Sequence, residues 1–163
     1  MAAAERPGEG PLDLAIERLV DAPARLIWAA WTVPQHLKRW WTPRPWETVE
    51  CDIDLRPGGI FRTVMRSPEG ALQPLLGCYL EIQPERRLVW TNVLEPGFRP
   101  AAEPFLGLTT VLTLEPEGDR TRYRALAMHP TPEIRRKHEE MGFYLGWNTV
   151  VDQLVDLVGS MKR

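Results

Sequence analysis

Alternation of apolar and polar residues along much of the chain predicts a series of β-strands. Four apolar residues from Val49 to Leu55 alternate with three acidic residues, which is typical of a sheet with one face in water. The same analysis predicts further strands over residues 12–20, 60–66, 75–82, 88–93, 108–115 and 121–128. Their connections are mostly short turns, so antiparallel neighbours are favoured over parallel ones, which need long crossovers.

Helical spacing predicts two short helices after the first strand and one long helix at the end of the chain. Asp21 before Pro23 marks the first helix start, and a second short helix restarts at Pro34. The long helix begins near Thr131. Its apolar stripe consists of Phe143, Trp147, Val150, Leu154, Leu157 and Met161. Such a stripe also fits a coiled-coil or dimer helix, but the preceding strands need one large apolar cover.

The order of these elements predicts one α+β domain over residues 12–163, after a disordered leader over residues 1–11. No internal repeat or low-complexity segment interrupts it. The longest irregular stretch inside the domain runs from Leu94 to Phe105. Its prolines predict a stiff shape, and Phe98 and Phe105 predict an apolar underside. This loop is a candidate lid over a pocket.

Composition narrows the choice of partners. A formal net charge of −2 gives no broad attraction to phosphates, so nucleic acid is not expected as a partner. No apolar run reaches the roughly 20 residues that cross a bilayer, and no signal peptide is recognisable, so we expect a cytoplasmic protein. Cys51 and Cys78 lie in strand-like runs, where a buried thiol is expected; a disulfide or a reactive thiol is the alternative.

Few residues suggest catalysis, and we name no catalytic residue, metal ligand or cofactor. The three histidines are His36, His129 and His138, and none forms a close-spaced pair with another histidine or a cysteine of the kind that binds metals. His129 either points into a pocket or caps a turn. His138 lies either at a cavity mouth or on a helix surface. If the protein is an enzyme, these two are the candidate acids or bases.

Several motifs, in order, resemble the family named activator of heat-shock-protein-90 ATPase homologue, of the START-like or SRPBCC superfamily. The motifs are Val20 to Pro23, Trp28 to Pro34, Leu37 to Trp41, Asp52 to Gly59, Gly77 to Pro84, Leu88 to Trp90, and Gly146-Trp147. The resemblance implies a helix-grip fold, in which a curved seven-stranded antiparallel sheet surrounds the long C-terminal helix. It also implies a deep cavity for hydrophobic ligands.

Under this resemblance, aromatic and methionine side chains are the candidate ligand-binding residues, because they make adaptable apolar walls. They are Trp40, Phe61, Met65, Tyr79, Trp90, Met128, Met141, Phe143, Tyr144 and Trp147, together with His129. Arg62 and Asn92 either orient a polar group of a ligand or face solvent. The alternative to a cavity is a fully packed core, which is the default for protein interiors.

The leading functional hypothesis is the binding of a small hydrophobic molecule without covalent chemistry. A second hypothesis, implied by the family's name, is a co-chaperone-like regulator of the heat-shock-90 ATPase or of a stress response. A third is a cyclase, hydrolase or isomerase that acts in the same cavity. A homodimer is a further expectation, with no surface assigned to it. Fold resemblance alone does not decide among these functions.

Overall fold

The computed structural model describes residues 10–162, and a bent seven-stranded antiparallel sheet dominates it. The strands are β1 (Asp13–Val20), β2 (Glu47–Ile53), β3 (Ile60–Arg66), β4 (Leu72–Gln83), β5 (Arg87–Thr91), β8 (Thr109–Glu117) and β9 (Arg120–Met128). Their order across the sheet is β1-β9-β8-β5-β4-β3-β2. All neighbouring pairs are antiparallel, as the short connections predict.

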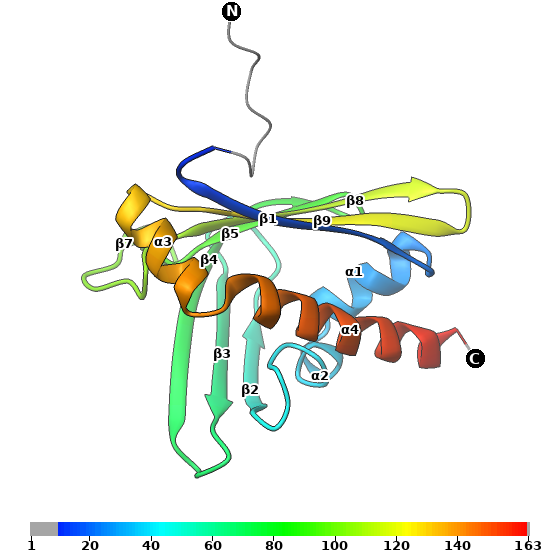
Figure 1. The fold of residues 1–163 in the computed structure, drawn as a ribbon, viewed down its shortest axis with the longest axis horizontal. Helices are drawn as coiled ribbons and strands as arrows, with labels where there is room; N and C mark the ends of the chain where they lie inside the picture. Colours follow the sequence, from blue (N-terminus) through cyan, green and yellow to red (C-terminus); the bar gives the residue numbers. More distant parts are fainter. Residues whose placement is uncertain (1–9, 163) are drawn as a thin grey trace, which may run out of the picture.

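Within residues 10–162, four helices complete the fold: α1 (Ala24–Thr32), α2 (Pro34–Leu37), α3 (Pro132–Glu140) and α4 (Phe143–Met161). Figure 1 shows that β1, β8 and β9 run across the view whereas β2 and β3 run down it, and that α4 lies in the hollow of this bend. The α+β class, the curved seven-stranded sheet and the two short helices after the first strand are therefore confirmed. A small additional hairpin, β6 (Leu94–Glu95) with β7 (Arg99–Pro100), lies within the predicted irregular loop.

The predicted long C-terminal helix is confirmed as α4, but its predicted start near Thr131 is wrong, because the chain breaks between α3 and α4. Thr131 caps α3 as predicted, with its hydroxyl accepting a hydrogen bond from the Ile134 amide. Gly142 then adopts a left-handed conformation with φ of 99°, which is a common way for a helix to end. The chain therefore changes direction before α4 begins.

Two other expectations concern the start of the chain. Residues 1–9 of the predicted leader lie outside the described residues, and Gly10 to Leu12 form a turn into β1. Asp21 does not cap α1, because the residue before the helix is Pro23 and no side chain caps it. The Pro at this place still suits a helix start, since the first amides of a helix have no partner within it.

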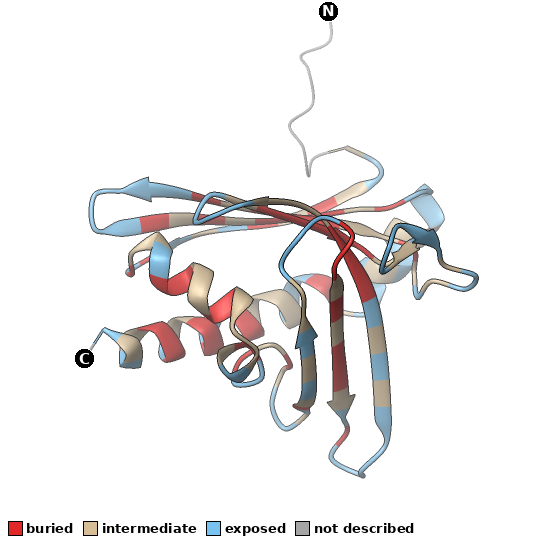
Figure 2. Cartoon of the chain, turned by 180° about the vertical axis from the view of Figure 1, so that it is seen from behind, coloured by how far each residue is buried: buried red, intermediate tan, exposed pale blue. Residues whose placement is uncertain are grey.

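The buried face of α4 packs on the sheet, as Figure 2 shows by its red positions. Its buried apolar residues are Phe143, Val150, Val151, Leu154, Leu157 and Val158. They join one core cluster with Trp31 of α1 and with inward-facing residues of the strands. The stripe is thus a core face, as we preferred over a coiled-coil seam.

A buried glutamine fastens α4 to the segment that follows α2. Gln153 is only 7% exposed, and its amide nitrogen donates to the carbonyl oxygens of Trp40 at 3.0 Å and Thr42 at 2.9 Å. Its carbonyl oxygen accepts from the Arg44 amide at 3.0 Å. One side chain therefore satisfies three backbone groups. This contact places Trp41 and Pro43 opposite the helix.

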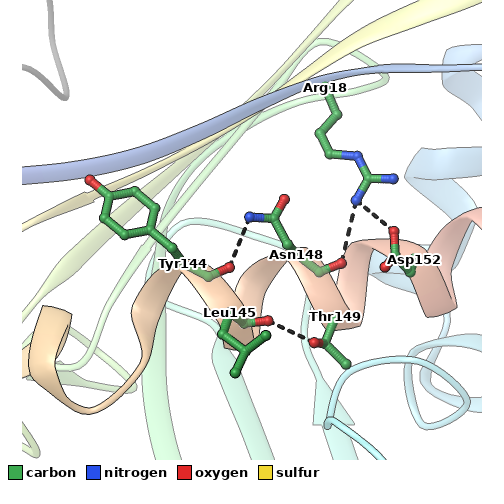
Figure 3. Close-up of polar contacts among 6 residues, drawn as sticks. All are labelled: Arg18, Tyr144, Leu145, Asn148, Thr149 and Asp152. Carbon is green, nitrogen blue, oxygen red and sulfur yellow. Dashed lines mark hydrogen bonds and ion pairs between the residues drawn. The ribbon is translucent and has the colours of Figure 1, made fainter.

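An arginine on β1 makes a second attachment to α4, shown in Figure 3. Arg18 Nη1 lies 2.8 Å from Asp152 Oδ1 and donates to the Asn148 carbonyl at 3.3 Å. Because Asp152 is largely exposed, the ion pair itself contributes little stability. The contact nevertheless fixes where α4 lies along β1.

The outer face of β2 and β3 is polar. Arg62 pairs there with Asp52 at 2.9 Å and with Glu50 at 3.5 Å, so it faces solvent and does not orient a ligand. Both cysteines are free; Cys78 is buried and Cys51 is half-buried. Burial raises the pKa of the Cys51 thiol to about 11, which makes it unreactive near neutral pH. Among the described residues, no helix is long and apolar enough to span a membrane.

Replacing Gln153 with methionine tests the glutamine attachment. The variant keeps the side chain's volume but leaves buried carbonyl and amide groups without partners. We expect the free energy of unfolding in urea to fall by about 2–4 kcal/mol. The matched control, Gln35→Met, changes an exposed residue of α2 and should alter stability by less than about 0.5 kcal/mol. Equal effects of the two changes would show that Gln153 does not fasten the helix.

Candidate functional site

A cavity of about 660 Å³ opens between the β3–β4–β5 part of the sheet and the N-terminal half of α4. This volume lies within the range of roughly 300–1,000 Å³ that is common for small-molecule sites. The interior is therefore not filled throughout, and the packed-core alternative does not describe this end of the domain.

The strands form one wall of the cavity. Adjacent strands supply it with Phe61, Thr63 and Met65 of β3, Pro74, Leu75, Leu76 and Gly77 of β4, Trp90 of β5, Thr110 of β8 and Ala127 of β9. Alternation along β3 puts the first three on one face. Gly77 belongs there because a Cβ atom would lie 3.1 Å from the Thr91 carbonyl oxygen.

The helical wall comes from the break between α3 and α4. It consists of His138 and Met141, the turn residue Gly142, and Phe143, Gly146, Trp147 and Val150 of α4. Gly146 leaves its position empty, since a Cβ atom placed there would meet no atom within 4 Å. The cavity is thus open on the helical side partly because Gly142 and Gly146 have no side chains.

A cluster of tryptophans closes the inner end of the cavity. The Trp31 ring lies 5.0 Å from the rings of Trp40 and Trp41, 5.2 Å from Trp90 and 6.3 Å from Trp147, measured between centroids. Edge-to-face and tilted contacts at these distances are favourable for aromatic rings. Trp41, Trp90 and Trp147 present their other surfaces to the cavity.

The loop predicted as a lid does contribute to the cavity wall. Its lining residues are Glu95, Ala101, Ala102, Glu103, Pro104 and Phe105, followed by Leu106 and Leu108. Asn92 fixes this segment rather than pointing at a ligand: its amide donates to the Phe105 carbonyl at 2.6 Å and accepts from the Leu108 amide at 2.9 Å. Phe98 does not lie under the lid, since it packs against Gly58 and is 50% exposed.

Two histidines from different elements form a hydrogen-bonded pair beside the cavity. His129 follows β9, and its Nδ1 atom lies 2.8 Å from the Leu12 carbonyl oxygen. Its Nε2 atom lies 2.8 Å from Nδ1 of His138, on α3. The His138 ring meets the Phe143 ring edge-to-face at 5.1 Å. Of the two alternatives for His129, the structure shows the one in which it secures the turn. His138, in contrast, lies in the cavity wall.

Burial of the His138 ring, reinforced by the neighbouring His129, lowers the pKa of His138 from its ordinary value of 6.5 to about 4. His138 is accordingly neutral at physiological pH. A group with so low a pKa is a weak general base near neutrality, so its expected role there is hydrogen bonding.

Six of the eleven predicted ligand-binding residues line the cavity. These are Phe61, Met65, Trp90, Met141, Phe143 and Trp147. They come from two strands, β3 and β5, from the helix α4 and from the break before it.

The other five predicted residues lie outside the lining. Trp40 packs behind Trp41 and donates from Nε1 to the Ala30 carbonyl, and Tyr79 stacks behind Phe61 at 5.3 Å. Met128 packs against Val89, Val111 and Leu126 in a separate cluster. His129 is covered by His138. Tyr144 is 43% exposed, and its ring extends from the start of α4 on the side where Arg18 lies (Figure 3).

Sequence reasoning also missed lining residues. Thr63 has a period-two spacing with Phe61 and Met65, so alternation alone could have found it. Thr110 lies beside Trp90 only through the pairing of β5 with β8, which the sequence does not specify. Within the described residues, no group of three or more histidine, cysteine or acidic side chains is arranged to hold a metal ion.

The fold and the cavity together define a class: an α+β domain in which a bent sheet and a C-terminal helix enclose a largely apolar site. The model of the family described as "Activator of Hsp90 ATPase homolog 1-like protein" matches residues 21–159. The chain therefore belongs to this family, as its motifs indicated.

Solved structures agree with this assignment. A protein of Nitrosomonas europaea is 46% identical, with a TM-score of 0.89 over 94% of this chain and 97% of that one. A Rhodobacter sphaeroides protein is 24% identical (TM-score 0.82; 93% and 94% covered). An AHSA1-like protein of Aeromonas hydrophila is 18% identical (TM-score 0.69; 93% and 94% covered). The last two show likeness of fold alone. No curated protein gives a significant match.

The lowered pKa of His138 predicts a pH dependence of stability. Unfolded chains take up this proton near pH 6.5 and the folded protein only near pH 4, so stability is present above pH 6.5 and is lost as pH falls between these values. Because the His138 ring is partly exposed, we expect the free energy of unfolding to fall by only about 2 kcal/mol over this range. Urea unfolding from pH 7 to pH 4 should show a smaller loss in His138→Gln. Equal losses of unfolding free energy between pH 7 and pH 4 in the variant and the wild type would contradict the lowered pKa of His138.

Proposed function

We propose that the protein binds a small hydrophobic molecule in the cavity between the sheet and α4, without covalent chemistry of its own. The observation that carries this proposal is the cavity itself, about 660 Å³ in volume and lined mainly by aromatic, aliphatic and methionine side chains. Burial of apolar surface would drive binding, at about 25 cal/mol per Å² of ligand surface removed from water, before the cost of association.

The revised set of ligand-binding residues supports this function better than catalysis. We assign Phe61, Met65, Trp90, Phe143 and Trp147 as the principal contacts, with Met141 at the opening. His138 is the one histidine in the lining, and its low pKa makes it a poor proton acceptor. The cyclase, hydrolase or isomerase alternative would therefore depend on the lining carboxyl groups of Glu95 and Glu103 for acid–base chemistry.

Titration with Nile red, a neutral dye that becomes fluorescent in apolar surroundings, tests the proposal directly. Quenching of Trp41, Trp90 and Trp147 should accompany the dye signal, because these three rings line the cavity. Native mass spectrometry of protein purified from its own host then asks whether a small molecule is already bound. Failure of Nile red and of a broad panel of apolar compounds to bind would refute the proposal.

Filling the cavity should abolish binding without unfolding the protein. Gly146→Leu places a side chain in open space on the cavity side of α4 and replaces a glycine inside a helix, so stability should be unchanged or higher. We expect affinity for Nile red to fall at least tenfold. The matched control is Gly159→Leu, a second α4 glycine with open space and no place in the lining. Equal affinities in the two variants would contradict the cavity as the site.

The family's description and an exposed apolar residue support a second candidate, regulation of an Hsp90-type ATPase. Leu145 at the start of α4 is 77% exposed, and an apolar side chain so placed suits contact with another protein. The measurement is the chaperone's ATPase rate with and without this protein. We expect a changed rate that Leu145→Glu abolishes while Nile red binding persists. An unchanged rate with the wild type would remove this candidate.

A further inference from the structure

We propose that the ligand of this cavity is a neutral hydroxylated molecule, and that its hydroxyl donates a hydrogen bond to Nε2 of His138. This inference rests on the proposed ligand-binding function and specifies the chemistry of the ligand. Three independent features of the described residues carry it: the orientation of the histidine pair, the charges in the lining, and two buried threonine hydroxyls.

The direction of the hydrogen bond between the two histidines follows from the group that His129 contacts on its other side, the Leu12 carbonyl. The Leu12 carbonyl can only accept, so Nδ1 of His129, at 2.8 Å, must carry a proton. We assign His129 the tautomer with its proton on Nδ1, in which Nε2 holds a lone pair, so Nδ1 of His138, 2.8 Å away, donates to it. The remaining nitrogen of the neutral His138 ring, Nε2, is therefore an acceptor.

That acceptor is available to a ligand. His138 belongs to the cavity lining, and its Nε2 atom has no hydrogen-bond partner among the described residues. It is also not among the buried side-chain atoms that lack a partner, which are Trp31 Nε1, Tyr79 Oη and Tyr123 Oη, so it is accessible. A fixed hydrogen-bond acceptor on an otherwise apolar wall favours a ligand with a hydrogen-bond donor, because a ligand without one leaves the acceptor unpaired.

The charges in the lining exclude an anionic ligand. Among the described residues that line the cavity, none is lysine or arginine, and the titratable groups are Glu95, Glu103 and His138. A carboxylate or phosphate would lose its hydration without gaining a cation, and it would face two carboxylates and a lone pair. A neutral molecule meets no such penalty.

Two hydroxyls on the sheet side provide further polar contacts. Thr63 and Thr110 are 2% and 1% exposed and line the cavity, so each brings a hydroxyl group to its sheet side. Buried hydroxyls are normally hydrogen-bonded. A ligand with an oxygen on this side could exchange hydrogen bonds with these hydroxyls, whereas a plain hydrocarbon could not.

Three compounds of the same ring size separate the possibilities: phenanthrene, 9-phenanthrol and phenanthrene-9-carboxylate, measured by equilibrium dialysis at pH 7. We expect 9-phenanthrol to bind about five- to tenfold more tightly than phenanthrene, the value of one hydrogen bond. The carboxylate should bind at least tenfold more weakly than phenanthrene. Equal binding of phenol and hydrocarbon, or preference for the carboxylate, would overturn the inference.

Variants at position 138 locate the effect. His138→Phe keeps a ring against Phe143 but removes the acceptor, so the ratio of the 9-phenanthrol affinity to the phenanthrene affinity should fall to about one. His138→Gln restores an acceptor and should recover part of the preference; it also serves if the phenylalanine variant does not fold. The control, His36→Phe, alters a histidine outside the cavity and should change nothing. Persistence of the preference in His138→Phe would overturn the assignment.

The outcomes also distinguish this inference from the function on which it depends. If Nile red binds but none of the three phenanthrenes shows a preference, the inference is wrong and the binding function stands. If neither Nile red nor any phenanthrene binds, the proposed function fails and the inference fails with it.

Discussion

The packing of Trp31 against four other tryptophans is the constraint on which the rest of the structure depends. These rings join α1, the segment after α2, β5 and α4, and their centroids lie 5.0–6.3 Å from Trp31. Large rigid rings cannot be compressed, so they hold α4 at a set distance from the bent sheet. The cluster fills one end of the hollow and acts as a spacer for the other, where the cavity remains.

The helix α4 consequently has two different halves. Its C-terminal half is sealed against the core by Leu154, Leu157 and Val158, and Gln153 fastens it to the segment that carries Trp41. Its N-terminal half carries Gly146 and Trp147, which border empty space. Stability is therefore concentrated in one half, and the other is free to serve a ligand. The same division explains why a larger side chain at position 146 should leave stability unchanged, whereas replacing Gln153 should lower it.

Sequence periodicity predicted the sheet and the core face of α4 because those features depend on local alternation. It predicted the site less completely. Alternation shows which face of a strand a residue occupies, but not which other side chains pack between that residue and the cavity. Tyr79 was predicted to line the cavity, yet it is fully buried and Phe61 stacks on it. Trp40 and Trp41 are neighbours in a turn, where no periodicity tells which ring points inward. The contribution of Thr110 required the strand register, which depends on contacts distant in sequence.

The break between α3 and α4, which the sequence analysis did not predict, has a consequence for the site. In a continuous α-helix, positions 138 and 143 are five residues apart, which places them about 140° apart around the axis. Their side chains would then diverge, and His138 could not meet the Phe143 ring. The left-handed turn at Gly142 redirects the chain, so that α3 brings His138 to His129 on one side and to the cavity on the other. The acceptor in the cavity wall is thus a product of the helix break.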